Sequence, residues 1–214
     1  FLAACDKTRR KDFGKPGSMK CKEDSFKTND PAEVVKSLRE STLLIVGNRH
    51  DQLIKTIGET FGTRVLPIEF KELDDLYLQA NQDEAAEWAD RWMKAAKKIV
   101  EPTREEIVKC GAMYLAMRTL LKNHNAQGIS INCLGGFYGG HIKAYPCLGF
   151  AQLNDDGLVG ACESDYVSTI SMLTMNYLTG RPGYISDPVI DTAKNQIIYA
   201  HCVAPTKVFG PQGL

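Results

Sequence analysis

The chain of 214 residues carries 26 basic and 26 acidic side chains, so its formal net charge is zero. This length suits one domain, or one domain and part of another. The apolar share of 43% and the charged share of 24% are typical of a globular protein and exclude disorder throughout. Zero net charge disfavours nucleic acid or a lipid surface as the partner, and no apolar run reaches the ~18–20 residues of a membrane span.

The first 30 residues form a polar segment with eight basic and five acidic side chains. Little in residues 1–30 can build a core, so we expect a basic arm or the remnant of a preceding domain. The sequence Leu-Ala-Ala-Cys at positions 2–5 resembles a bacterial lipidation box, but no apolar stretch precedes it. We therefore expect a cytoplasmic protein, with export as the alternative.

Strand and helix patterns alternate from about residue 31. The continuous apolar run at 42–47 is typical of a strand that is buried on both faces. A helix is expected to begin near Asp51, and a second strand at 64–70. The pairs Asn81 with Glu84 and Thr103 with Glu106 are capping signals that predict the starts of two long helices.

The second half continues the alternation. Strands are predicted at 128–133, 157–162, 184–186 and 196–200, with a helix at about 164–178 that ends at Gly180. Alternating strands and helices imply right-handed crossovers. The predicted fold class is therefore α/β, an open and mostly parallel sheet with helices on both faces, as in Rossmann-like or flavodoxin-like folds.

Polar side chains follow three of these strands. Glu163 and Asp165 come after the strand at 157–162, Asp187 after 184–186, and His201 after 196–200. Ligands of parallel sheets bind at the carboxyl ends of strands, and two acids with an imidazole suit a divalent cation such as Mg²⁺ or Mn²⁺. Structural alternatives remain open, because the acids can complement a helix dipole or form a turn, and the histidine can be an ordinary half-buried one.

A glycine-rich stretch follows the strand at 128–133. Residues 133–141 read Cys-Leu-Gly-Gly-Phe-Tyr-Gly-Gly-His and contain neither a P-loop nor G-x-G-x-x-G. Because glycines let the backbone approach a ligand closely, Gly135, Gly136 and His141 are candidate substrate-binding residues. A mobile turn is the alternative interpretation.

Seven cysteines are spread over the whole chain, and no two of them form a C-x-x-C pair. Mostly reduced, buried thiols are the expected interpretation. A zinc site remains conceivable, although the spacings match no zinc pattern. Its ligands would come from Cys133, His141, Cys147, Cys162, His201 and Cys202.

An E-x-D motif at Glu163–Asp165 opens an apolar helix, Leu-Thr-Gly-Arg-Pro at 178–182 closes it, and Asp187 follows 24 positions after Glu163. With these motifs, the segment from Cys133 onward resembles the L-fucose isomerase family and its L-arabinose isomerase relatives. The two metal-binding acids of fucose isomerases have the same spacing of 24 positions. The resemblance is weaker over residues 38–132.

This resemblance implies a metal-dependent aldose–ketose isomerase, an intramolecular oxidoreductase that acts on a sugar. Glu163, Asp187 and His201 would hold Mn²⁺ or another divalent cation, and Glu163 and Asp187 would transfer the proton between C1 and C2. Asp165 would be a substrate-binding residue next to the metal ligands, or a helix cap. A homo-oligomer is also implied. The alternative is a carbohydrate-binding or regulatory relative without turnover.

The resemblance also sets the expected domain organisation. Residues 31–187 correspond to the middle α/β domain of the family, and residues 188–214 to the start of a C-terminal, β-rich part. In fucose isomerases a histidine of that C-terminal part completes the metal site, whereas His201 matches a histidine of arabinose isomerases. We therefore expect the chain to be truncated, and the isomerase to be inactive as this fragment or to use His201 instead.

Overall fold

The structure is a computed structural model that describes residues 27–210. Most of the basic arm expected at residues 1–30, and the segment around Cys5, lie outside the described residues. Within residues 27–210, no helix is long and apolar enough to cross a membrane.

Four parallel strands form the central sheet in the order β2-β1-β3-β4. They are β1 (Thr42–Val46), β2 (Arg64–Ile68), β3 (Gly128–Ile131) and β4 (Val159–Cys162). Every residue of β1, β3 and β4 is buried, as expected for strands covered on both faces. The predicted α/β class with a mostly parallel sheet is confirmed.

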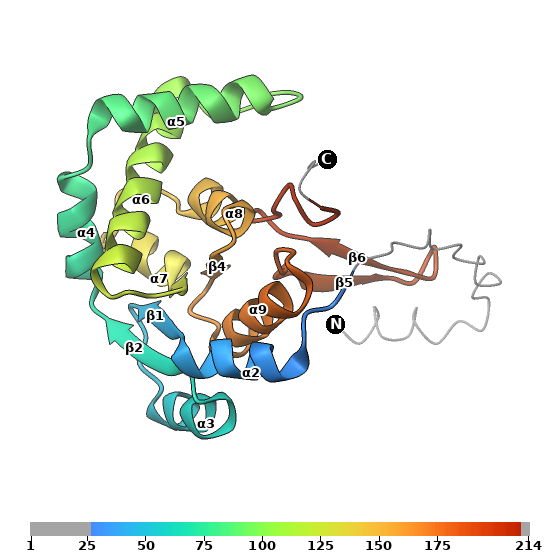
Figure 1. The fold of residues 1–214 in the computed structure, drawn as a ribbon. Helices are drawn as coiled ribbons and strands as arrows, with labels where there is room; N and C mark the ends of the chain where they lie inside the picture. Colours follow the sequence, from blue (N-terminus) through green and yellow to red (C-terminus); the bar gives the residue numbers. More distant parts are fainter. Residues whose placement is uncertain (1–26, 211–214) are drawn as a thin grey trace, which may run out of the picture. The chain divides into compact units, whose positions relative to one another are not determined.

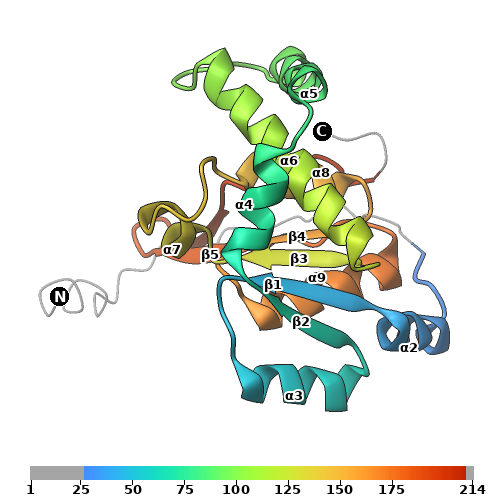
Figure 2. The same ribbon diagram turned by 90° about the vertical axis from the view of Figure 1, so that its left-hand side faces the viewer.

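Helices cover both faces of this sheet (Figure 2). One face carries α2 (Pro31–Glu40), α3 (Asp51–Phe61) and α9 (Tyr166–Thr179). The other carries α4 (Phe70–Leu78), α6 (Arg104–Asn123) and α8 (Cys147–Asp155), with α5 (Gln82–Ala95) packed on α6. Successive side chains of β1 alternate between the two hydrophobic clusters, because strand side chains alternate in direction.

The capping signals place the helix starts correctly. Thr103 and Glu106 form a reciprocal capping box at the start of α6, and the Asn81 side chain accepts N–H groups of the first turn of α5. Gly180 ends α9 in the left-handed conformation, as predicted. Trp88 of α5 packs edge-on against Tyr114 of α6 at 4.7 Å between ring centroids, which makes it part of the core.

The expected strand at 128–133 is two residues too long. β3 ends at Ile131, and the short helix α7 (Cys133–Tyr138) begins directly afterwards. Asn132 is the cause, because its side chain accepts the N–H of Gly135 and caps the helix. Much of the glycine-rich stretch is thus helical and not a turn.

The strand predicted at 184–186 is wrong. Residues 180–186 are irregular, and β5 (Asp187–Asp191) pairs antiparallel with β6 (Gln196–Ala200). Asp191 accepts the N–H groups of Ala193 and Lys194, and so short a connection joins only antiparallel strands. Asp187 and His201 therefore do not follow strands of the parallel sheet, contrary to the expectation of one shared edge.

The chain divides into two compact units (Figure 1). The described part of the smaller unit is the hairpin segment, residues 186–201. The described part of the larger unit comprises residues 27–185 and 202–210, and it contains the whole parallel sheet.

Candidate active site

The order of the strands locates a binding crevice in the larger unit. From β1 the chain passes through α3 to its neighbour β2, and later through α4, α5 and α6 to its other neighbour β3. The chain thus goes first to the strand on one side of β1 and then crosses to the strand on its other side. Ligands of open α/β sheets bind at the carboxyl ends of the strands at such a switch point. The candidate site is therefore the edge where β1, β3 and β4 end, at Val46, Ile131 and Cys162.

Glu163 and Ser164 form a strained turn at this edge. Both have positive φ angles, 66° and 52°, although neither is glycine. The Ser164 hydroxyl donates to the Val46 carbonyl at 2.9 Å, and the Ser164 N–H donates to the Ile131 carbonyl at 3.1 Å. These bonds tie the turn to the ends of β1 and β3, and the Glu163 side chain is exposed. Left-handed non-glycine residues of this kind concentrate at functional sites.

Asp165 caps the N-terminus of α9. Its carboxylate accepts the N–H of Ser168 at 2.9 Å and the hydroxyl of Ser168 at 2.5 Å. Both oxygens are therefore engaged within the first turn of the helix. The structure assigns Asp165 a capping role that orients the turn next to it, and its part in substrate binding stays a prediction.

The two predicted glycines lie in the helix that follows β3. The N–H of Gly135 is accepted by Asn132, so this group is already used. A Cβ atom at Gly136 would lie 2.6 Å from the Phe70 ring, and the Gly136 carbonyl accepts the N–H groups of His141 and Ile142. Close packing against Phe70 thus accounts for glycine at position 136.

His141 is exposed and stacks on Phe70, with 5.1 Å between the ring centroids and 8° between the planes. Phe70 in turn fills the space beside Gly47, where a Cβ atom would lie 2.0 Å from the ring. Gly47 has φ of 74°, so both the conformation and the space require glycine. The Phe70 ring therefore joins the end of β1 to the glycine-rich segment.

The loop between β1 and α3 is held by Tyr166. Its hydroxyl accepts the N–H of His50 at 3.1 Å and donates to the carbonyl of Asn48 at 3.1 Å. Burial raises the pKa of Tyr166, so its hydroxyl stays protonated and able to donate. The sequence alone did not indicate Phe70, Ser164 and Tyr166 as site residues. Ser164 and Tyr166 lie two and four residues after the strand predicted at 157–162, and Phe70 was placed at the end of the strand predicted at 64–70, although it begins α4.

The hairpin unit carries the remaining predicted ligands. Asp187 is exposed and pairs in register with Ala200, the residue before His201. The register therefore places Asp187 and His201 at the same end of the hairpin. Glu163 belongs to the larger unit.

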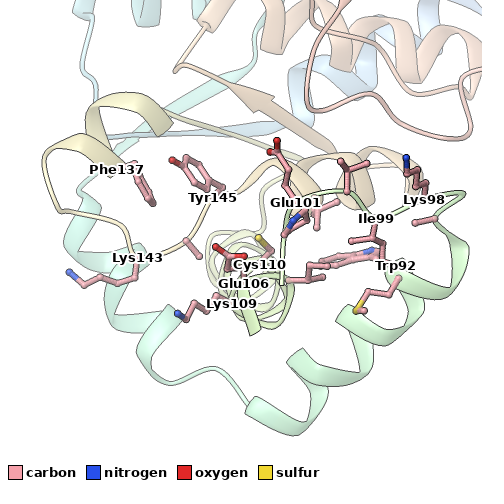
Figure 3. A pocket seen from close by; sticks show the side chains of 17 residues that line it. Trp92, Lys98, Ile99, Glu101, Glu106, Lys109, Cys110, Phe137, Lys143 and Tyr145 are labelled. Atoms are coloured by element: carbon pink, nitrogen blue, oxygen red, sulfur yellow. The ribbon is translucent and has the colours of Figure 1, made fainter. Parts of the chain in front are cut away.

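A separate cavity of about 640 Å³ opens elsewhere in the larger unit (Figure 3). Trp92, Phe137 and Tyr145 supply aromatic walls, and the rings of Phe137 and Tyr145 stack with 4.0 Å between centroids. Charged side chains also line it, namely Lys98, Glu101, Glu106, Lys109 and Lys143. None of the predicted site residues is part of this lining.

Comparison with known proteins decides the relationship. Sulfoquinovose isomerase of Priestia aryabhattai is 26% identical over 206 residues, which is 90% of this chain and 44% of that protein. Sulfoquinovose isomerase of Clostridium sp. (strain MSTE9) is 31% identical over 147 residues, 67% of this chain and 32% of that protein. The chain is related to sugar isomerases.

The match covers only part of each relative. The chain spans less than half the length of these curated relatives. No protein-family model matches the chain. The sugar isomerase part of the sequence interpretation is supported by these relatives, whereas the narrower assignment to fucose or arabinose isomerases stays a prediction.

Proposed function

We propose that this chain forms the metal-binding and proton-transferring part of an aldose–ketose isomerase. The observation that carries the proposal is the similarity to sulfoquinovose isomerases over 90% of the chain. Two features of the larger unit support it. The sheet has a switch point that suits a small ligand, and an exposed carboxylate, Glu163, lies in a strained turn at that edge.

The donor set suits a divalent cation. Glu163 and Asp187 offer carboxylate oxygens and His201 offers an imidazole, a combination that Mn²⁺ accepts readily. Both carboxylates are exposed, so neither is withdrawn into the core. In this proposal the three side chains hold Mn²⁺ or a similar cation. When bound, the cation would polarise the sugar carbonyl and lower the cost of the enediolate.

The two carboxylates then act as the proton-transfer pair. One, as the carboxylate, removes the proton from the carbon next to the carbonyl, and the other, protonated from solvent, gives a proton to the former carbonyl carbon. The hydroxyl proton moves from O2 to O1, so that C1 and C2 exchange oxidation state, and solvent restores both carboxyl groups to their starting forms. The Ser164 bonds to Val46 and Ile131 fix the backbone that carries Glu163, which limits the movement of this base. A base that is already held in place lowers the activation free energy of the reaction. The entropy cost of orienting it is met when the protein folds and not during the proton transfer.

Sulfoquinovose, the sugar named for the relatives, is the first substrate to test. We propose a small-molecule sugar as the ligand and a homo-oligomer as the assembly, as the resemblance implies. Which sugar the protein accepts depends on the side chains that contact the hydroxyl groups of the substrate.

The test uses the full-length natural protein, freed of metal and reloaded with Mn²⁺. We expect interconversion of the aldose and the ketose that EDTA abolishes. Glu163→Gln and Asp187→Asn should each lower kcat by about 10²–10⁴-fold, the usual contribution of a general base. Glu59→Gln is the matched control, because Glu59 is an equally charged, exposed residue on α3, and it should leave kcat unchanged.

Two outcomes contradict the proposal. If the full-length protein binds no divalent metal at the carboxylates, the enzyme interpretation fails. If it binds the sugar saturably without turnover, and this binding survives EDTA and both substitutions, the chain is the non-catalytic carbohydrate-binding relative.

A further inference from the structure

Two cysteines that are 55 residues apart in sequence bring their sulfur atoms into contact in the larger unit. Cys147 opens α8 and Cys202 begins the segment 202–210, and their Sγ atoms are 3.3 Å apart. Both are free thiols, of which Cys147 is half-buried and Cys202 is exposed. The proposed isomerase mechanism uses neither thiol, so this contact is independent of the proposed function.

The segment that carries Cys202 is fixed against α8. The Asp155 carboxylate, at the end of that helix, accepts the N–H and hydroxyl of Thr206 and the N–H of Lys207, and the Lys207 ammonium donates to the Asp155 carbonyl. Val203, the residue after Cys202, is buried in the core. These contacts hold Cys202 beside α8, so the closeness of the two sulfurs is built into the fold.

The contact joins two thiols and is not part of a metal site made of cysteines. Within residues 27–210, no three cysteine sulfurs lie within 4.8 Å of one another, so a tetrahedral zinc held by cysteines alone is not supported. The buried Cys162 has its sulfur within 4.8 Å of that of Cys202, which makes it the thiol that competes with Cys147. The bonds that fix residues 202–210 on α8 favour Cys147.

We propose that Cys147 and Cys202 form a reversible disulfide when the protein meets a low-molecular-weight disulfide such as glutathione disulfide. A disulfide bond is ~2.05 Å long, so two sulfurs at 3.3 Å need to approach by only about 1 Å. Cysteines that respond to oxidants are accessible and lie next to a second thiol that closes the bond. The exposed Cys202 beside the half-buried Cys147 is such a pair.

The exchange takes two steps, and Cys202 reacts first because it is exposed. Its sulfur attacks one sulfur of glutathione disulfide, whose S–S bond breaks, and the glutathione that leaves takes up the proton that Cys202 releases. The Cys147 sulfur then attacks the Cys202 sulfur, and the second glutathione leaves with the Cys147 proton. Two protein thiols are thereby oxidised, and one glutathione disulfide is reduced to two glutathione thiols.

Cys147 is suited to the second step. The hydrogen bond with Cys162 lowers the pKa of Cys147, but contact with the Cys202 thiol and burial outweigh it and raise this pKa to about 12. Cys147 therefore stays protonated at neutral pH and reacts slowly with a disulfide in solution. The Cys202 sulfur, in contrast, is already held 3.3 Å away, so the reaction between the two is intramolecular.

The disulfide joins the segment 202–210 covalently to α8. This segment follows the hairpin segment 186–201 in the chain, so the bond fixes the point at which the chain returns to the larger unit. The bond also closes a loop between residues 55 positions apart, which lowers the conformational entropy of the unfolded chain. Oxidation should therefore raise the Tm.

The test incubates the reduced full-length protein with glutathione disulfide, blocks the remaining thiols and maps the joined peptides by mass spectrometry. We expect the Cys147 and Cys202 peptides to be linked, full reversal by dithiothreitol, and a Tm several degrees higher in the oxidised protein. Cys147→Ser should stop at the mixed disulfide of Cys202 with glutathione, and Cys202→Ser should form neither product. Cys110→Ser is the matched control, because Cys110 is a half-buried thiol of α6, and it should behave as the wild type.

Asp155→Ala tests whether the fold supplies the closeness of the sulfurs. Loss of the bonds to Thr206 and Lys207 should lower the equilibrium constant for closing the disulfide, measured in glutathione redox buffers, by roughly fivefold or more. The first reaction of the exposed Cys202 should not become slower. A disulfide between Cys162 and Cys202, a glutathione adduct that never closes in the wild type, no reaction at all, or an unchanged equilibrium constant in Asp155→Ala would each overturn the proposal.

Discussion

The parallel sheet and the β5–β6 hairpin are both built from short strands with apolar residues, but they differ in how far those residues are buried. Every residue of β1, β3 and β4 is buried, whereas nine of the ten residues of β5 and β6 are exposed. Ile190 of β5 is 73% exposed, and Ile45 of β1 is 0% exposed. The sheet is therefore stabilised by burial on both faces, and the hairpin by its ladder and its turn. An apolar strand sequence alone does not reveal which case applies.

The largest effect is expected in the core that covers the sheet. Phe150 of α8 is completely buried and packs against β4 at Gly160. Phe150→Ala should lower the free energy of unfolding by about 3–5 kcal/mol, because it removes apolar contacts and leaves a cavity. Urea denaturation followed by circular dichroism measures this change. A loss below about 1 kcal/mol would contradict a core centred on this sheet.

A second test compares two helical glycines of the larger unit. A Cβ atom at Gly111 of α6 would lie 2.4 Å from the Ala85 carbonyl oxygen of α5, so Gly111→Ala should cost about 1–3 kcal/mol by overpacking. At Gly58 of α3 the nearest atom would be 3.9 Å away, so Gly58→Ala should stabilise the unit by about 0.5–1 kcal/mol. Equal Tm shifts in the two variants would show that α5 and α6 do not approach as closely as described.

The capping box at α6 should have an intermediate effect. Thr103→Ala removes an oxygen that accepts the N–H of Glu106, and it should cost about 1 kcal/mol. In the same capping box the Thr103 N–H donates to the Glu106 carboxylate, and this hydrogen bond lowers the pKa of Glu106. The stability that this hydrogen bond gives the folded protein is present at neutral pH, and it is lost as the pH falls through the lowered pKa of Glu106. Thr103→Ser, which keeps the acceptor, should behave as the wild type.

The hairpin should respond least. Ile190→Ser replaces an exposed side chain of β5 and should change the free energy of unfolding by less than about 0.5 kcal/mol. Thermal unfolding of this variant beside Phe150→Ala gives the contrast directly. A cost of several kcal/mol for Ile190→Ser would mean that the hairpin is covered in the folded protein.

The sequence predicted the parts of the fold that depend on local chemistry. Continuous apolar runs indicated β1 and β4, and the side chains of Asn81 and Thr103 indicated where helices begin. These features work within a few residues, so periodicity and capping rules describe them. The parallel sheet followed from the alternation of strands and helices.

The errors arose where pairing partners decide the structure. Asp187 was expected after a strand of the parallel sheet, but the turn at Asp191 pairs β5 with β6. Gly136 was considered for ligand contact, but its neighbour Phe70 is 66 residues away in sequence. The contact between the sulfurs of Cys147 and Cys202, which are 55 residues apart, likewise depends on elements distant in the chain. Such contacts form in the tertiary structure between residues that are far apart in sequence. Local sequence patterns therefore do not predict them.

Glu163 is the residue on which the proposed sugar isomerisation depends most directly. The most direct measurement is proton NMR of the full-length protein with Mn²⁺ and sulfoquinovose in D₂O. Proton transfer between C1 and C2 through a carboxylate predicts appearance of the ketose with solvent deuterium entering these positions, and loss of both in Glu163→Gln but not in Glu59→Gln. Unchanged deuterium incorporation and turnover in Glu163→Gln would contradict the claim.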